Sequence, residues 1–367
     1  MKESKGWDDS RDIAVIGNYG QGNFGDDLLS DYVIRAITCV VAPNRLIVTG
    51  PSGSYLETWF PGILCVPMDA VFRNPDKGVR KIIFGGGGQF FAFPPATPRN
   101  VWGLRKATAF RFRSMIRSVD RRRLEAYAFC VGIGPLEGFA ARWITRSILT
   151  RIQQISVRDE VSCSFLRELG VDGFRMVTDP AVGSLVSLRS SSAIHGEKIG
   201  IIVRYWPRDM EADKCIASLL QAAALLRDFG HTVEFISFQR QYDEPALELL
   251  RTSGEEARIW DPMKDTIQGF CKYLSEFRAL VTMRAHGLYA GTLMGVPCIA
   301  VEIEPKLRIA AENCGLGAYV VETSSSPAEI VETISKAIEQ RTADRDWHTE
   351  IQRLESETER LCKWVQS

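Results

Sequence analysis

IAVIGNYGQGNFGDD, residues 13–27, is the stretch that decides the fold of this 367-residue chain. An apolar run at 13–16 leads into a glycine-rich turn, and a helical pattern starts directly after the turn. A buried strand that passes through such a turn into a helix is typical of a parallel α/β sheet. Gly20, Gly22 and Gly25 formally complete a G-x-G-x-x-G motif, which by itself would indicate a dinucleotide site.

Asp26 and Asp27 argue against that cofactor. They stand where the helix begins, so a pyrophosphate bound there would meet two negative charges. The second predicted strand also ends in Thr49 and Gly50, without the acidic residue that holds a ribose hydroxyl. The alternative is that the glycines permit a tight turn and the aspartates only cap the helix, which explains one aspartate more easily than both.

The rest of the chain repeats the strand and helix alternation. Strands are predicted at 13–16, 46–49, 63–66, 81–84, 127–131, 155–158 and 174–177, and then at 199–204, 232–238, 258–260, 279–283 and 297–301. This pattern predicts two Rossmann-like, doubly wound α/β domains that face each other across a cleft. The predicted division is an N-terminal domain on the acceptor side at 1–186, a linker at 187–198, a C-terminal domain on the donor side at 199–343, and a closing helix packed on the body at 344–367.

Composition excludes several classes of protein. Lys plus Arg and Asp plus Glu both total 45, so the chain has no overall charge excess to attract nucleic acid. The nine cysteines form no Cys-x-x-Cys pair and none lies beside a histidine at zinc-ligand spacing, which favours a reduced compartment and no metal site. The first twelve residues are polar, and no apolar run approaches ~20 residues. We expect a cytoplasmic protein.

A second glycine cluster, residues 85–88, follows the predicted strand at 81–84. Such a cluster is useful where the backbone passes close to a ligand, although a plain tight loop explains it equally well. An apolar loop containing Phe90 and Phe91 is expected next. The stretch 105–123 then has eight Lys or Arg residues against one acid and forms a basic amphipathic pattern. The insertion 90–123 either docks peripherally on the inner face of the cytoplasmic membrane or simply packs its apolar face against the protein.

Charged side chains follow several predicted strands. Arg284 and His286 come directly after the strand at 279–283, Lys306 follows the strand at 297–301, and Arg204 and Arg158 end two others. The carboxyl ends of parallel strands form the ligand-binding edge of an α/β sheet. Arg and Lys bind anions there, and His acts as an acid or a base. The sequence therefore predicts a site for a small, highly anionic compound. The simpler alternative is that His286 only caps a helix or packs against one.

The order of the motifs resembles the polysaccharide pyruvyl transferase family. The motifs are GNFGDD at 22–27, GGGG at 85–88, VGIGPL at 131–136, SVRD at 156–159, TDPA at 178–181, MRAHG at 283–287 and EPK at 304–306. The resemblance implies a glycosyltransferase-B-like pair of domains, phosphoenolpyruvate as donor, and a sugar of a bacterial exopolysaccharide or cell-surface polysaccharide as acceptor, with a lipid-linked repeat unit as one form of it. The products would be a pyruvate ketal and phosphate, with no cofactor and no metal. Asp27 stands where Glu is common in the family, and Glu304 where Asp is common.

Ketal formation requires an acid/base pair and cations for both ends of the donor. The resemblance supports Arg158, Arg204, Arg284 and Lys306 as donor-binding residues, Asp26 and His286 as catalytic residues, and Gly22, Gly25, Gly86, Gly87 and Gly88 as parts of the glycine-rich loops. The position of Asp26 at a helix N-terminus tends to keep it ionised, which favours a base role. Exchanging the roles of Asp26 and His286 is equally allowed.

Two other functions fit the same fold. One is a nucleotide-sugar-dependent glycosyltransferase, because fold alone does not fix function. The other is a non-catalytic homologue that binds a saccharide.

Overall fold

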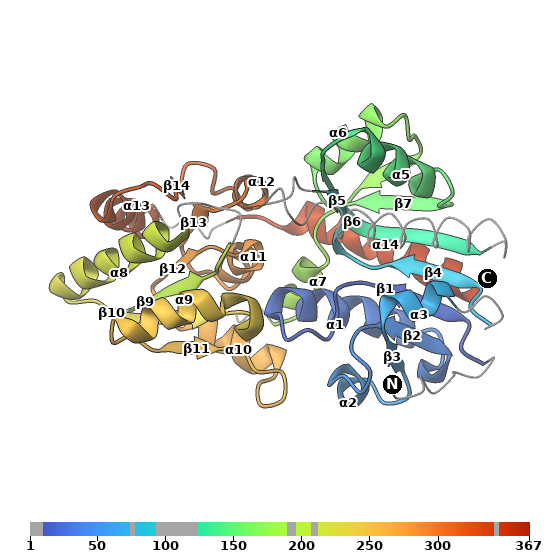
Figure 1. The fold of residues 1–367 in the computed structure, drawn as a ribbon, viewed down its shortest axis with the longest axis horizontal. Helices are drawn as coiled ribbons and strands as arrows, with labels where there is room; N and C mark the ends of the chain where they lie inside the picture. The colour runs from blue at the N-terminus through green and yellow to red at the C-terminus, as the bar shows by residue number, and fades with distance from the viewer. Residues whose placement is uncertain (1–9, 74–77, 93–123, 189–195, 207–211, 341–344) are drawn as a thin grey trace. The chain divides into compact units, whose positions relative to one another are not determined.

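The computed structural model describes residues 10–73, 78–92, 124–188, 196–206, 212–340 and 345–367 (Figure 1). The chain divides into two compact units. Unit 1 comprises residues 1–21, 29–180 and 349–367, and unit 2 comprises residues 22–28 and 181–348. This division differs from the predicted boundaries: residues 22–28 and 181–186 group with unit 2, and all but the first residue of the C-terminal helix group with unit 1.

Unit 1 is built on a parallel sheet of the doubly wound type. The strand order is β3-β2-β1-β4-β6-β7-β8, with β5 paired to β6. The strands are β1 (Ile13–Ile16), β2 (Leu46–Thr49), β3 (Leu64–Val66), β4 (Lys81–Phe84), β5 (Gly87–Ala92), β6 (Glu125–Leu136), β7 (Gln154–Val157) and β8 (Phe174–Met176). The helices are α1 (Phe24–Thr38), η1 (Pro43–Arg45), α2 (Leu56–Trp59), α3 (Met68–Arg73), α5 (Phe139–Leu149), α6 (Glu160–Glu168) and α14 (His348–Gln366). Every residue of β1, β2 and β4 is buried, as expected of central strands covered on both faces.

Strand β5 corrects one prediction. The sequence predicted a loop at Phe90 and Phe91, but the chain turns only at 85–86 and then pairs in parallel with β6. Phe90 is buried against Phe84, with ring centroids 5.4 Å apart, and this packing holds the strand in place. The remainder of the predicted basic insertion, 93–123, lies outside the described residues, so its helix stays a prediction.

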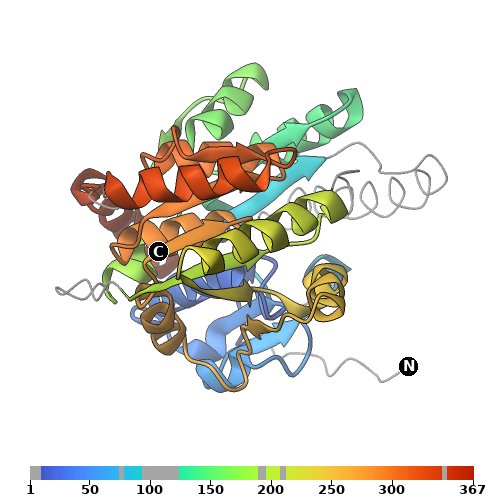
Figure 2. The same cartoon turned by 90° about the vertical axis from the view of Figure 1, so that its left-hand side faces the viewer.

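Unit 2 has the strand order β11-β10-β9-β12-β13-β14, and every neighbouring pair is parallel. The strands are β9 (Lys198–Val203), β10 (Thr232–Ser237), β11 (Ala257–Ile259), β12 (Ala279–Thr282), β13 (Cys298–Glu302) and β14 (Val320–Glu322). The helices are α7 (Ala181–Val186), α8 (Ala212–Asp228), α9 (Arg240–Thr252), α10 (Ile267–Ser275), α11 (Ala285–Leu293), α12 (Pro305–Asn313) and α13 (Pro327–Glu339), and Figure 2 shows α8 and α13 side by side. The strand order reverses between β9 and β12, and this is the point at which such sheets bind ligands.

Phe24 explains why the first turn of α1 belongs to unit 2. Its ring is fully buried, with centroids 4.8 Å from Phe238, 5.1 Å from Trp260 and 4.8 Å from Phe270. Its backbone N–H also donates to the carbonyl oxygen of Phe238 at 3.0 Å. This aromatic cluster fixes the N-terminus of α1, and with it the two aspartates that follow, against unit 2.

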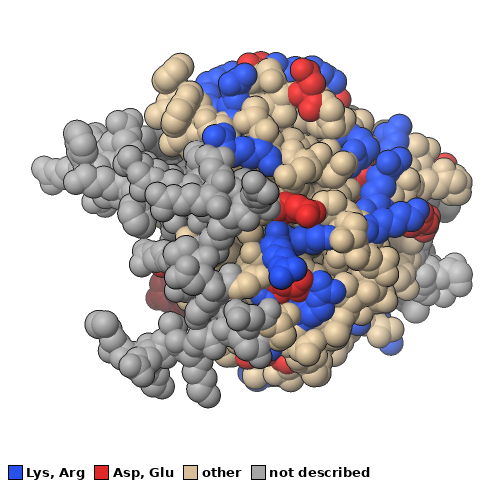
Figure 3. Space-filling model, turned by 90° about the vertical axis from the view of Figure 1, so that its right-hand side faces the viewer, with Lys and Arg blue, Asp and Glu red and all other residues tan. Residues whose placement is uncertain are grey.

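Some of the exposed charges of unit 1 form ion pairs in the described part of the chain. Arg142 of α5 pairs with Glu168 of α6, and Arg167 pairs with Glu160 at 2.6 Å. Figure 3 shows basic and acidic side chains close together on the described part of one face. Among the described residues, no helix has both the length and the apolar character needed to cross a membrane, and no cluster of His, Cys, Asp and Glu has the composition of a metal site.

Candidate active site

The carboxyl ends of the central strands of unit 2 carry the predicted cations. Arg204 follows β9, Arg284 follows β12 as the N-cap of α11, and Lys306 is the second residue of α12, after β13. His286 is the second residue of α11. The predicted donor-binding residues of this unit therefore gather at the point where its strand order reverses.

Asp26 joins this cluster from the first turn of α1. A Cβ atom on Gly25 would lie 1.9 Å from Nδ1 of His286, so the imidazole packs directly on the backbone beside Asp26. The side-chain amide of Asn23 donates to Oδ2 of Asp26 at 2.8 Å. Although the sequence assigned Asp26 to the N-terminal domain, it groups with His286 in unit 2.

Burial raises the pKa of Asp26, and the electrostatic interactions with His286, Lys306 and Arg284 oppose that shift without cancelling it. The sequence-based argument expected the helix N-terminus to keep this carboxyl ionised. Desolvation of this half-buried group outweighs the helix dipole, whose effect is modest. The structure therefore favours the protonated form of Asp26 more than the sequence did.

Asp27 has a different environment. Its side chain is fully buried, and Nε1 of Trp260 donates to its Oδ2 at 2.7 Å. The side chain that caps α1 is instead Asn23, whose Oδ1 accepts from the N–H of Gly25 at 3.1 Å. The interpretation that the two aspartates merely cap the helix is therefore wrong, because Asp27 ties the helix to unit 2 and Asp26 faces the cation cluster.

Glu304 links two of the cations. Lys306 Nζ donates to its Oε1 at 2.7 Å, and Arg204 binds the same oxygen. Burial alone would raise the pKa of Glu304, but the charges of Lys306 and Arg204 together lower it, so this carboxylate stays ionised. Burial lowers the pKa of Arg204 while Glu304 opposes the shift, and the guanidinium of Arg204 lies 4.5 Å from the ring centroid of Trp206.

Asp243, in the first turn of α9, pairs with Arg284. Nη2 of Arg284 donates to Oδ1 of Asp243 at 2.6 Å, and both side chains are buried. Sequence reasoning missed both Asp243 and the pairing role of Glu304. Glu304 stood in a recognised motif, but Asp243 lies 41 residues from its partner in an unremarkable amphipathic helix and carried no signal.

Arg158 belongs to unit 1, where it follows β7. Its Nη1 donates to Oδ2 of Asp179 at 2.6 Å, and its Nε lies 3.3 Å from Oδ2 of Asp159. Asp159 also caps α6 by accepting from the N–H of Ser162. The backbone of Gly132 passes so close that a Cβ there would lie 3.0 Å from Nε of Arg158. Unit 1 thus holds this arginine rigidly at a strand end.

The glycines of unit 1 make room for packing. A Cβ on Gly17 would lie 2.4 Å from the ring of Tyr19, and one on Gly85 would lie 2.3 Å from its hydroxyl. A Cβ on Gly86 would meet Pro180 at 2.8 Å. Among the other loop glycines named from the sequence, Gly22 and Gly87 have positive φ, of 65° and 84°, and a Cβ on Gly88 would make only an ordinary contact. The buried ring of Tyr19 fills the space beside the glycine-rich turn.

The unit 2 cluster combines three kinds of group. Arg204, Arg284 and Lys306 supply positive charge for an anion. Asp26 and His286 are the pair with acid/base chemistry. Asp243 and Glu304 are buried carboxylates that hold the cations. Such a set suits a small anionic substrate whose reaction needs proton transfer.

Comparison with known proteins gives both a family and a fold. The family model for polysaccharide pyruvyl transferase matches residues 23–305. Among similar solved structures is a UDP-GlcNAc 2-epimerase from Methanocaldococcus jannaschii, with 9% sequence identity, a TM-score of 0.63, and coverage of 97% of this chain and 99% of that chain. A UDP-GlcNAc 2-epimerase from Neisseria meningitidis has 12% identity and a TM-score of 0.58, with coverage of 96% of this chain and 98% of that chain. A sucrose-phosphate synthase from Thermosynechococcus elongatus is also similar, with 11% identity, a TM-score of 0.55, and coverage of 97% of this chain and 96% of that chain. No curated protein matches the sequence. At these identities the structural likeness concerns the fold alone, and it confirms the predicted glycosyltransferase-B-like class.

Proposed function

The chain belongs to the polysaccharide pyruvyl transferase family, and on that premise we propose that it transfers pyruvate from phosphoenolpyruvate to a sugar of a bacterial exopolysaccharide or cell-surface polysaccharide, or of its lipid-linked repeat unit. The products are a pyruvate ketal and inorganic phosphate. Membership of the family supports pyruvyl transfer to a polysaccharide. Support for this donor and this product comes from the chemistry of the unit 2 cluster.

The observation that carries the proposal is the gathering of Arg204, Arg284 and Lys306 around Asp26 and His286 within one compact unit. Phosphoenolpyruvate has a carboxylate at one end and a phosphate at the other, so it needs cations at both ends. Its methylene carbon must also receive a proton. A single cluster that offers several cations and two acid/base groups meets both needs.

The proposed reaction proceeds in balanced steps. The methylene carbon takes up a proton, and the adjacent carbon is attacked by the first sugar hydroxyl, which loses its proton to a base. Phosphate then leaves with the electron pair of the C–O bond. The second hydroxyl attacks the same carbon and loses its own proton, which completes the ketal. Two hydroxyl protons are released; one replaces the proton used on the methyl group, and the other ends on phosphate.

In this scheme Asp26 supplies the proton to the methylene carbon, because its burial raises its pKa and favours the protonated form. His286 takes the hydroxyl proton. Arg204, Arg284 and Lys306 bind the donor, and Arg158, which belongs to unit 1, stays a predicted donor-binding residue. The scheme uses no cofactor and no metal.

Titration calorimetry with phosphoenolpyruvate tests the donor and the site together. The native protein is compared with Arg204→Ala and His286→Ala, and with Arg251→Ala as a control, since Arg251 is an exposed arginine of the same unit on α9. We expect binding by the native protein and the control and weakened or lost binding in the two site variants. Phosphate release with candidate saccharides, and the mass of the product, then identify the ketal. Binding of UDP-GlcNAc by a native protein that ignores phosphoenolpyruvate would overturn the proposal in favour of a nucleotide-sugar enzyme.

A lipid-linked acceptor would place the protein at a membrane surface, and we propose the remainder of the basic insertion, 93–123, as the contact. Its basic residues suit anionic lipid. Replacing Arg111, Arg113 and Arg117 by Gln should weaken sedimentation with anionic liposomes and leave sedimentation with neutral liposomes unchanged. Equal sedimentation of native and variant proteins with anionic liposomes would exclude this contact.

A further inference from the structure

Asp243 connects the ends of three neighbouring strands of unit 2. Its Oδ1 accepts from Nη2 of Arg284, after β12, at 2.6 Å and from the N–H of Tyr205, after β9, at 3.4 Å. Its Oδ2 accepts from the hydroxyl of Ser237, at the end of β10, at 2.8 Å. The side chain is fully buried, so both oxygens depend on these donors in place of water.

Arg284 is correspondingly restricted. Its side chain is buried, and one edge of the guanidinium is engaged by Asp243. Its Nε is buried and has no hydrogen-bond acceptor among the residues that the structure describes. A buried donor of this kind is costly unless a partner arrives, which is what an anionic ligand would provide.

Asp243 also offsets a repulsion. Arg204 and Arg284 are close enough for the charge of Arg284 to lower the pKa of Arg204, after the larger effect of burial, while the charge of Asp243 acts in the opposite direction. Without a carboxylate between the two strand ends, the guanidinium groups would repel each other in a buried environment. Glu304 supplies the matching carboxylate for Arg204 and Lys306.

We propose that Asp243 is a positioning residue of the donor site: it holds the guanidinium of Arg284 in place and leaves Nε of that arginine for the anionic donor. The inference rests on the proposed function, since it names the residue that orders one of the proposed donor-binding groups. Asp243 itself does not touch the substrate. It acts through Arg284.

Asp243→Asn is the main test, because it removes the charge and keeps the shape. We expect the Kd for phosphoenolpyruvate to rise about 10- to 100-fold, the range for losing a hydrogen bond to a charged group. Asp243→Glu, which restores the charge, should recover part of the affinity. Ser237→Ala leaves the carboxylate in place and removes one neutral donor, so a rise of about 2- to 10-fold is expected. It also keeps the proposal testable if Asp243→Asn does not fold.

Glu357→Gln is the matched control. Glu357 is a buried carboxylate that pairs with Arg175 at 2.7 Å within unit 1, and it lies outside the cation cluster. Its loss should lower the melting temperature without changing the Kd of the folded protein. A purely structural role for Asp243 would instead lower the melting temperature of Asp243→Asn as well and leave its Kd unchanged, and that result would overturn the proposal.

A second measurement needs no ligand. Phenylglyoxal labelling, followed by peptide mass spectrometry, compares the modification rate of Arg284 in the native and Asp243→Asn proteins, with Arg227 as the internal reference. Release of Arg284 should raise its rate several-fold relative to Arg227, and an unchanged rate would overturn the proposal. If the native protein binds no phosphoenolpyruvate, the proposed function fails, and this labelling result still decides whether Asp243 holds Arg284.

Discussion

The strand order reverses at corresponding points in the two units, but different side chains occupy those points. In unit 1, the ends of β1 and β4 are packed with the buried ring of Tyr19. In unit 2, β9 and β12 lead into Arg204 and Arg284. The shared topology creates a similar strand edge in each unit. The side chains determine which edge is filled by packing and which carries charge.

Glycine shows the same contrast. Gly17 and Gly85 of unit 1 leave space for an aromatic ring that contributes to the core. Gly25 of unit 2 leaves space for the imidazole of His286, beside Asp26. Both sets look alike in the sequence, because Gly17, Gly25 and Gly85 all belong to glycine-rich stretches. Their consequences should differ: substitution in unit 1 should affect stability, and substitution in unit 2 should affect activity.

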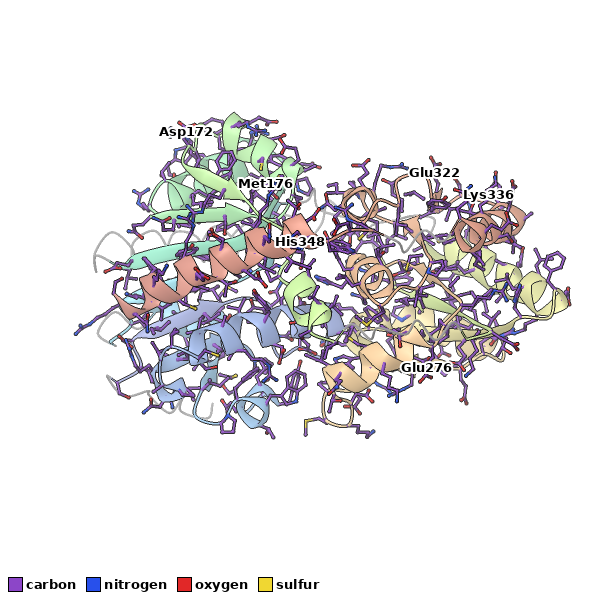
Figure 4. The ribbon with its side chains drawn as sticks, turned by 180° about the vertical axis from the view of Figure 1, so that it is seen from behind. Asp172, Met176, Glu276, Glu322, Lys336 and His348 are labelled. Carbon is purple, nitrogen blue, oxygen red and sulfur yellow. The ribbon has the colours of Figure 1, made fainter. Side chains whose placement is uncertain are left out.

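The largest effect should come from His286→Ala. Loss of an acid/base group lowers the rate by about 10²- to 10⁴-fold, and we expect kcat for phosphate release to fall in that range. His348 provides the control, since it is exposed, and Figure 4 labels it at the start of α14. His348→Ala should retain native activity. An active His286→Ala protein would mean that the unit 2 edge is not the catalytic one.

Gly25→Ala should have the next largest effect. The added Cβ would lie 1.9 Å from Nδ1 of His286, so the imidazole must move from its position. Displacing a catalytic group by about 1 Å costs about 10²-fold in rate. The matched control is Gly317→Ala, in the same unit, where a Cβ would meet only an ordinary contact at 3.6 Å. If the two variants have comparable activities, Gly25 is not needed to leave space for the imidazole of His286.

The sequence predicted the positions of the strand-end cations because parallel strands place their carboxyl ends at one edge, whatever else the chain does. Arg204, Arg284 and Lys306 could therefore be identified from local patterns. Asp243 could not, because its role depends on a partner 41 residues away. The packing of Tyr19 against Gly85 could not be predicted either, because these two residues also lie far apart in the sequence. Strand β5 was missed because the two glycines at its start, Gly87 and Gly88, have low strand propensity, and pairing with β6 decides its conformation.

Gly85→Ala tests the unit 1 side of the comparison. A Cβ at this position would lie 2.3 Å from the hydroxyl oxygen of Tyr19, in a fully packed interior. Overpacking of this kind costs about 1–3 kcal/mol, so the free energy of unfolding measured in urea should fall by that amount. The Kd of the folded variant for phosphoenolpyruvate should stay at the native value. A large rise in Kd without loss of stability would show that the unit 1 edge also takes part in binding.

The smallest effect concerns stability and Asp26. Because burial raises its pKa above the ordinary value of 3.8, ionising Asp26 costs more in the folded protein than in the unfolded chain. The free energy of unfolding therefore falls as the pH rises from 3.8 through the raised pKa and is constant above it. Asp26→Asn removes this penalty and should stabilise the protein by about 0.5–2 kcal/mol at neutral pH, with the gain shrinking as the pH falls through the raised pKa and lost below pH 3.8.

Urea unfolding of Asp26→Asn and of the exposed control Asp228→Asn, each at neutral and acidic pH, measures this difference. The control should match the native protein at both pH values. If Asp26→Asn is more stable than the native protein but no longer releases phosphate, the carboxyl of Asp26 takes part in the reaction and lowers the stability of the fold. If Asp26→Asn is less stable than the native protein at neutral pH, the neighbouring cations stabilise the ionised carboxylate of Asp26. Asp26 would then be the base of the reaction.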